Sequence, residues 1–124
     1  MTQKIVPLIH VPNMRATIDW YASVGFKVVN EGKEDGREDG EVVWALLSFG
    51  NSELMLDIGG KPSTAHRREV DLYIYLDDVD ALARRLRDRV EVVVDMNETF
   101  YGMREFIIRD INGFWITFGQ PVKK

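Results

Sequence analysis

Few side chains in this chain of 124 residues are of the types that carry out acid–base or metal chemistry. The chain contains no cysteine, which excludes thiol catalysis, cysteine-based redox chemistry and cysteine zinc sites. It has two histidines, His10 and His66, which leave little room for a histidine-rich metal centre, and His66 is expected to be exposed in a polar connector. His10, Asp71 and Glu105 are therefore the candidates for a general base.

A second set of residues could bind an organic molecule rather than react with it. Side chains of a strand point alternately to its two faces, and this alternation places the following residues on a common face: His10, Trp44, Met55, Asp57, Asp71, Tyr73, Tyr75, Trp115 and Thr117. Phe100 and Tyr101 join the set from a loop. Aromatic rings with a few carboxylates suit a flat, partly cationic ligand. Alternatively, Trp44 and Trp115 fill the core or a dimer interface.

The elements that must position these residues follow from hydrophobic periodicity and turn signals. Eight short strands are predicted, over 4–11, 26–30, 42–49, 53–58, 70–76, 90–94, 103–109 and 114–119. Two helices are predicted after Asn13 and Asp78, which can cap them, and Gly25 suits the end of the first helix. Asp77 and Asp80 lie on either side of Asp78, at the start of the second helix. The helix dipole stabilises negative charge there, so a capping role explains these acids better than a catalytic pair of carboxylates.

The order of these elements predicts an internal duplication. Each half of the chain runs strand, helix, strand, strand, strand, with about 62 residues per unit. Hairpin turns at 50–52 and 112–113 occupy matching places in the two halves. The polar connector 59–68 is the expected boundary. We therefore predict one domain over 1–124, with module one at about 1–60 and module two at about 68–124.

Composition excludes several classes of protein. A net charge of −4 and a pI of about 5.2 disfavour a nucleic-acid partner. No apolar run approaches the roughly 20 residues of a membrane span, and the start of the chain lacks a secretory signal, so we expect a cytoplasmic protein. The segment 31–41 holds six acidic and two basic side chains and no apolar one. It is expected to be a solvated, mobile connection, or alternatively a lid that attracts cationic ligands.

Three stretches resemble the vicinal oxygen chelate superfamily, which includes glyoxalase I, bleomycin-resistance proteins and extradiol dioxygenases. They are Val11-Pro12-Asn13 with Thr17, Trp20-Tyr21 and Gly25-Phe26; Leu76-Asp77-Asp78-Val79-Asp80-Ala81; and Tyr101 to Phe106 with Arg109 to Gly113 and Phe118-Gly119-Gln120. Ile111 departs from the family, which usually has proline there. The resemblance implies an α+β fold of two βαβββ modules, forming a cup-shaped mixed β-sheet with helices on the convex face. It also implies a homodimer whose ligand sites draw on both modules.

The same resemblance locates the metal ligands of catalytic members, which hold a divalent ion with the first and last strand of each module. The matching positions in this chain are Val6, Met55, Asp71 and Thr117. Valine and methionine offer no hard donor, threonine a weak one, and only Asp71 a good one. We therefore predict no metal and no cofactor. His10 remains open between a ligand contact, a hydrogen-bonded structural histidine at a dimer seam, and a metal ligand.

The resemblance and the donor set together favour one function. The chain is expected to be a metal-free binding protein of the bleomycin-resistance type, which sequesters an aromatic or hydrophobic small molecule such as an antibiotic. One alternative is a metal-free enzyme with His10, Asp71 or Glu105 as general base. The other is a metal-dependent lyase, isomerase or dioxygenase, which would require a different strand register.

Overall fold

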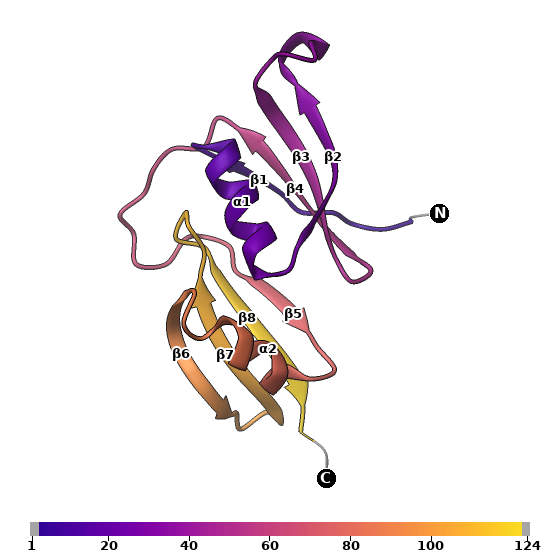
Figure 1. Cartoon of the computed structure of the whole chain (residues 1–124). Coiled ribbons are helices and arrows are strands. Elements are labelled where there is room, and N and C mark those ends of the chain that lie inside the picture. Colours follow the sequence, from indigo (N-terminus) through magenta and orange to yellow (C-terminus); the bar gives the residue numbers. More distant parts are fainter. Residues whose placement is uncertain (1–2, 123–124) are drawn as a thin grey trace. The chain divides into compact units, whose positions relative to one another are not determined.

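The computed structural model describes residues 3–122 and divides the chain into two compact units, Met1–Pro62 and Ser63–Lys124 (Figure 1). Within the described residues, two α-helices and eight strands form two four-stranded mixed sheets. Each unit runs strand, helix, strand, strand, strand. The α+β fold of two βαβββ modules is therefore confirmed.

The first unit forms a sheet in the order β1-β4-β3-β2. Its elements are β1 (Leu8–Val11), α1 (Met14–Val24), β2 (Lys27–Lys33), a 3-10 turn (Glu34–Gly36), β3 (Val42–Phe49) and β4 (Ser52–Ile58). β1 runs parallel to β4, and the other neighbours are antiparallel.

The second unit repeats this topology in the order β5-β8-β7-β6. Its elements are β5 (Leu72–Tyr75), α2 (Val79–Leu86), β6 (Glu91–Glu98), β7 (Met103–Arg109) and β8 (Trp115–Pro121). Again the first strand is parallel to the last one, β5 to β8, and the remaining pairs are antiparallel.

Both helices begin at the predicted caps. The side chain of Asn13 accepts a hydrogen bond from the Ala16 amide at 3.0 Å, and that of Asp78 accepts one from the Ala81 amide at 3.0 Å. These contacts satisfy amides that the first turn of a helix leaves without a partner. Gly25 ends α1 with a φ of 118°, a left-handed conformation that glycine adopts without strain.

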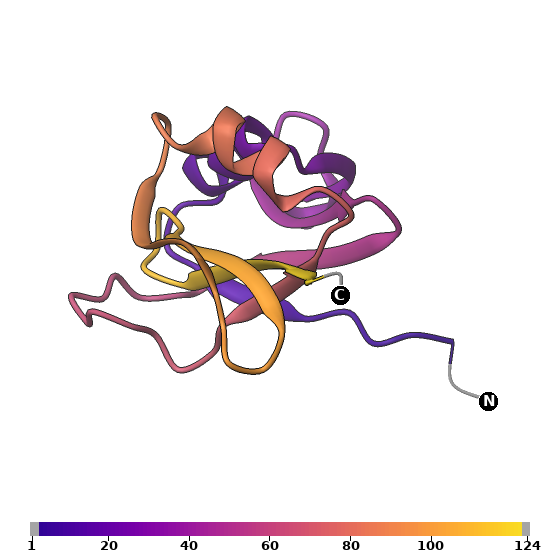
Figure 2. The ribbon, with the colours of Figure 1, turned by 90° about the horizontal axis from the view of Figure 1, so that it is seen from below.

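Each helix lies across one face of its own sheet (Figures 1 and 2). The apolar side chains of that face are buried: Val11, Ala45, Leu47, Leu54 and Leu56 with Ile18, Tyr21 and Val24 of α1, and Phe106, Ile108, Ile116 and Phe118 with Val79, Leu82 and Leu86 of α2. The strands alternate, so the residues between these point to the opposite face. We call that opposite face the open face of each sheet.

Several strand boundaries differ from the predicted ones. β1 starts at Leu8 rather than at residue 4, because Pro7 has no amide for the ladder. β5 is shorter than predicted, and β6 runs on to Glu98, where backbone pairing with β7 continues beyond the apolar run. β8 likewise continues to Pro121.

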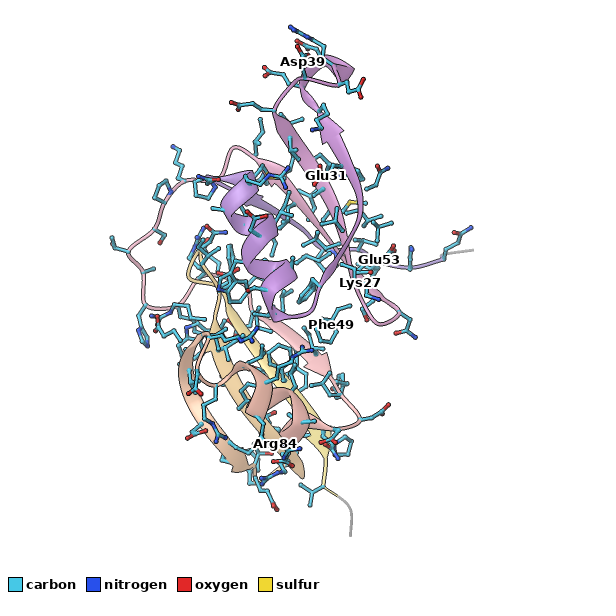
Figure 3. All side chains as sticks on the ribbon, viewed as in Figure 1. Lys27, Glu31, Asp39, Phe49, Glu53 and Arg84 are labelled. Carbon is cyan, nitrogen blue, oxygen red and sulfur yellow. The ribbon has the colours of Figure 1, made fainter. Side chains whose placement is uncertain are left out.

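The prediction that all of 31–41 forms a solvated connection is wrong for its first three residues. These lie in β2, where Glu31 pairs with Ala45 and Gly32 with Trp44. Backbone pairing needs no apolar side chain, so the acidic composition did not prevent it. Residues beyond them form the tip of the β2–β3 connection, where Asp39 lies (Figure 3).

A buried carboxylate shapes the turn between β7 and β8. Asp110 is 5% exposed, and its side chain accepts hydrogen bonds from the amides of Asn112 and Phe114, both at 2.8 Å. Gly113 supplies the left-handed residue of this turn, with a φ of 89°. The hairpin predicted from Asn112-Gly113 is confirmed.

We predict that Asp110→Ala lowers the free energy of unfolding by about 2 kcal/mol, because it leaves two amides of the turn without an acceptor. Urea denaturation followed by circular dichroism measures the change. Asp39→Ala is the control: its carboxylate is exposed and pairs with exposed Arg37 at 3.3 Å, so the substitution should change stability little. Equal effects of the two substitutions would contradict the role assigned to Asp110.

Candidate functional site

The open face of the first sheet carries the predicted residues of module one. In the β1–β4 register His10 pairs with Asp57, and in the β3–β4 register Asp57 pairs with Trp44. Met55 lies two residues before Asp57 in β4 and pairs with Leu8. The structure therefore brings His10, Trp44, Met55 and Asp57 together on this face.

The ring of His10 has a defined orientation. Its Nδ1 lies 2.9 Å from the carbonyl oxygen of Ile58, and a carbonyl oxygen only accepts, so Nδ1 carries the proton. In the neutral form of the ring, Nε2 is then the acceptor. Asp57 uses one carboxylate oxygen to accept a hydrogen bond from the Ile58 amide at 2.8 Å. This face thus offers an imidazole nitrogen, a carboxylate and an indole side by side.

The open face of the second sheet carries a hydrogen-bonded cluster centred on Glu105. This carboxylate is only 5% exposed. One oxygen accepts a hydrogen bond from the Tyr73 hydroxyl at 2.5 Å, and the other accepts one from the Tyr101 hydroxyl at 2.7 Å. A buried carboxylate is costly without such donors, so the two phenols stabilise it and are held by it.

The cluster changes the acidity of both phenols. Burial first, and then the hydrogen bond to Glu105, raise the pKa of Tyr73 above its ordinary value. The hydrogen bond to Glu105, followed by burial, raises the pKa of Tyr101. A phenol with a raised pKa stabilises the fold fully below its unfolded pKa of about 10. That contribution is lost as the pH rises through the folded pKa.

A glycine makes room for this arrangement. Tyr73 lies across β8 to reach Glu105, and a Cβ atom at Gly119 would come within 2.9 Å of the Tyr73 ring carbon Cζ. Glu105 and Gly119 are direct partners in the β7–β8 register. Any side chain at residue 119 would therefore displace the ring from its carboxylate.

Further aromatic side chains surround the cluster. Tyr75 is 72% exposed, with its ring centroid 4.9 Å from that of Tyr73. Phe100 is fully exposed, with its centroid 5.1 Å from that of Tyr101. Thr117 is buried and pairs with Tyr73 in the β5–β8 register. We call Tyr73, Tyr75, Phe100 and Tyr101 the tyrosine face.

The remaining predicted residues of module two contact the connector. The guanidinium of Arg67 lies 4.3 Å from the centre of the Trp115 ring. Its Nε donates to one oxygen of Asp71 at 3.2 Å, and a second guanidinium nitrogen donates to the other oxygen. The hydrogen bond to Asp71 raises the pKa of Arg67. Asp71 and Trp115 are therefore brought together, with Arg67 between them and solvent.

The connector is more structured than a plain polar boundary. His66 is exposed as predicted, yet its carbonyl oxygen accepts hydrogen bonds from the Trp115 indole at 3.1 Å and from Arg109 at 2.7 Å. Arg68 lies over the Phe114 ring at 4.4 Å and donates to the carbonyl of Asn112 at 2.9 Å. Residues 66–68 thus pack on the second sheet.

Two residues of this site are not in the predicted ligand set. The sequence predicts Glu105 only as a general base, but it alternates with the apolar residues Met103 and Ile107 in β7, which indicates a buried carboxylate with partners. Arg67 lies in a segment without periodicity, so no local signal indicates that it stacks on Trp115.

The positions that match the family's metal ligands do not fit a divalent cation. Val6 has no donor, and Met55 has only a thioether. Both oxygens of Asp71 accept hydrogen bonds from Arg67. Between residues 3 and 122, no group of three or more histidine, aspartate or glutamate side chains is placed to hold a metal ion.

Comparison with known proteins identifies the family. The Glyoxalase/Bleomycin resistance protein/Dioxygenase superfamily matches residues 5–118, so the chain belongs to this superfamily. No curated protein sequence matches the chain. Among the residues described here, no helix is long and apolar enough to cross a membrane.

Solved structures share the fold at low sequence identity. TioX from Micromonospora sp. ML1 is 19% identical, with 98% of each chain covered and a TM-score of 0.73. A bleomycin resistance determinant encoded on the transposon Tn5 is 17% identical, with 97% of this chain and 98% of that one covered and a TM-score of 0.73. A bleomycin-binding protein in complex with bleomycin is 15% identical, with 96% and 98% covered and a TM-score of 0.72.

We predict that Glu105→Gln lowers the pH at which two of the four tyrosines ionise, because the substitution removes the negative charge that opposes phenolate formation. Absorbance at 295 nm between pH 8 and about 12.5 follows the ionisation. Glu91→Gln is the matched control, since its carboxylate pairs with Arg109 at 2.5 Å. A Glu105→Gln curve that overlays the wild-type curve would show that Glu105 does not control these phenols.

Proposed function

We propose that this protein binds an aromatic or hydrophobic small molecule, such as an antibiotic, without a metal ion, and that the tyrosine face is the main contact surface. The observation that carries the proposal is the grouping of four exposed aromatic side chains around one buried carboxylate. Single exposed apolar residues are ordinary, but a group on one face indicates a binding surface.

The hydrogen bonds within the group support binding rather than core packing. Glu105 holds the rings of Tyr73 and Tyr101 in defined orientations. Because these rings are already held in place, the binding of a ligand costs the protein less side-chain entropy than it would if the rings had to become ordered. The helix-covered face already contains the apolar core of the unit, including Phe106 and Phe118, so the tyrosine face is not needed to build it.

The open face of the first sheet supports the same function. Trp44 offers an apolar surface, while Asp57 and Nε2 of His10 offer polar groups that can orient a ligand. The likeness to a bleomycin-binding protein supports bleomycin as the first compound to test.

A general-base enzyme is less well supported. Both oxygens of Glu105 accept hydrogen bonds from tyrosines, and both oxygens of Asp71 accept them from Arg67. A carboxylate in that state is a poor acceptor for a substrate proton. Of the three predicted candidates, His10 retains a nitrogen oriented to accept one.

We predict that metal-free bleomycin binds the protein in the presence of EDTA, and that Tyr101→Ala weakens this binding about tenfold, as expected when an aromatic contact is lost. Tyr75→Ala should act in the same direction. Isothermal titration calorimetry measures both, and the same screen extends to other aromatic antibiotics.

Val29→Ala is the control, because Val29 is an exposed apolar residue of β2, outside the tyrosine face. Binding that survives both tyrosine substitutions would refute this choice of surface. A screen in which no compound binds the wild-type protein would refute the function itself.

Metal analysis separates this function from metal-dependent catalysis. Because the donor positions do not suit a divalent cation, we predict that the purified protein carries no stoichiometric metal. Mass spectrometric elemental analysis measures the content after dialysis against Mg²⁺, Mn²⁺, Zn²⁺ and Fe²⁺ in turn. One tightly held ion per chain, lost together with ligand binding on chelation, would overturn the proposal.

A further inference from the structure

We propose that Asp71 and Trp115 form a subsite for an organic cation with a planar, forked group such as an amidinium or guanidinium. In this view Arg67 is an internal competitor that lies in the subsite until a ligand displaces it. The inference extends the proposed function, because it names the chemistry of one end of the ligand.

The contacts of Arg67 are those that such a ligand would make. Its planar guanidinium stacks on the Trp115 indole at 4.3 Å and donates to both oxygens of Asp71. A forked donor facing both carboxylate oxygens is the arrangement by which arginine recognises carboxylates, and a point charge such as lysine does not reproduce it. The subsite is therefore selective for planar cations.

Comparison with the next residue supports the displacement of Arg67. Arg68 makes the same kind of contact, over Phe114, but its side chain is only 13% exposed and it also holds the turn carbonyl of Asn112. The side chain of Arg67 is 56% exposed. Exposed ion pairs contribute little to stability and are screened by salt, so a ligand cation can replace Arg67 at small cost.

The subsite keeps its shape without Arg67. The Trp115 indole donates to the carbonyl of His66, which Arg109 also holds, so the ring is fixed by contacts independent of Arg67. Arg109 is itself a positive group beside the subsite, and Glu91 pairs with it at 2.5 Å. Because Glu91 already pairs with Arg109, the carboxylate of Asp71 is left for an incoming cation once Arg67 is absent.

The position of the subsite relates it to the tyrosine face. Trp115 and Thr117 are two residues apart in β8 and so point to the same face, about 7 Å apart. Thr117 lies opposite Tyr73. A molecule whose cationic end occupies the subsite can extend its aromatic part over the tyrosine face.

Benzamidine, a planar amidinium on an aromatic ring, is the probe. We expect Arg67→Gln to bind benzamidine about tenfold more tightly than the wild type, and Arg67→Gln with Asp71→Asn to lose this gain. Arg68→Gln should bind like the wild type. Titrations follow the indole Nε1–H signal in two-dimensional nitrogen–proton NMR, assigned to Trp115 as the signal missing in Trp115→Phe. Neutral benzamide should not bind any variant.

Circular dichroism melting verifies that each variant is folded before titration. Equal benzamidine affinity for the wild type and a folded Arg67→Gln would overturn the competitor role. No binding to a folded Arg67→Gln would overturn the subsite.

These outcomes are separate from those of the proposed function. If bleomycin binding depends on Tyr101 while benzamidine fails, only the subsite is refuted. If benzamidine binds at Trp115 while neither bleomycin nor any other antibiotic of the screen binds, only the proposed function is refuted.

Discussion

The burial of one carboxylate, Glu105, determines how the open face of the second sheet is built. A carboxylate that is 5% exposed must be hydrogen-bonded, and here the donors are two phenols, Tyr73 and Tyr101. Tyr73 reaches it by lying across β8, which requires Gly119. Both phenols therefore direct their protons toward Glu105, while Tyr73 and Tyr101 remain 40% and 55% exposed.

The repeated topology leaves one sheet face of each unit without a helix of that unit. Each unit has one α-helix and one four-stranded sheet, so one sheet face packs against that helix and the opposite face does not. The side chains of the two open faces differ although the topology is the same. His10, Asp57 and Trp44 line the first, and aromatic side chains around a carboxylate line the second. The same backbone thus presents two different chemical surfaces.

Local signals predicted most of the fold, because caps and hairpin turns act over a few residues. Asn13 and Gly25 bound α1 as expected. The alternation of strand side chains likewise placed the predicted binding residues on the open faces. What the sequence could not supply was pairing between distant residues. Tyr73 and Glu105 are 32 residues apart, and Arg67 stacks on a tryptophan of the last strand. The homodimer, the cup shape and the cytoplasmic location stay predictions.

The tyrosine face and the subsite at Asp71 and Trp115 have similar electrostatic properties, so both favour a positively charged ligand. Phenols that donate to Glu105 become better acceptors through their own oxygens, and aromatic rings carry negative potential on their faces. Asp71 adds a carboxylate, and the cation that lies there, Arg67, belongs to the chain itself. Acceptors, ring faces and a carboxylate all favour positively charged, hydrogen-bond-donating aromatic molecules. Val6 and Met55 carry no hard donor for a divalent metal and Thr117 carries only a weak one, which agrees with the proposal that the protein binds an organic molecule.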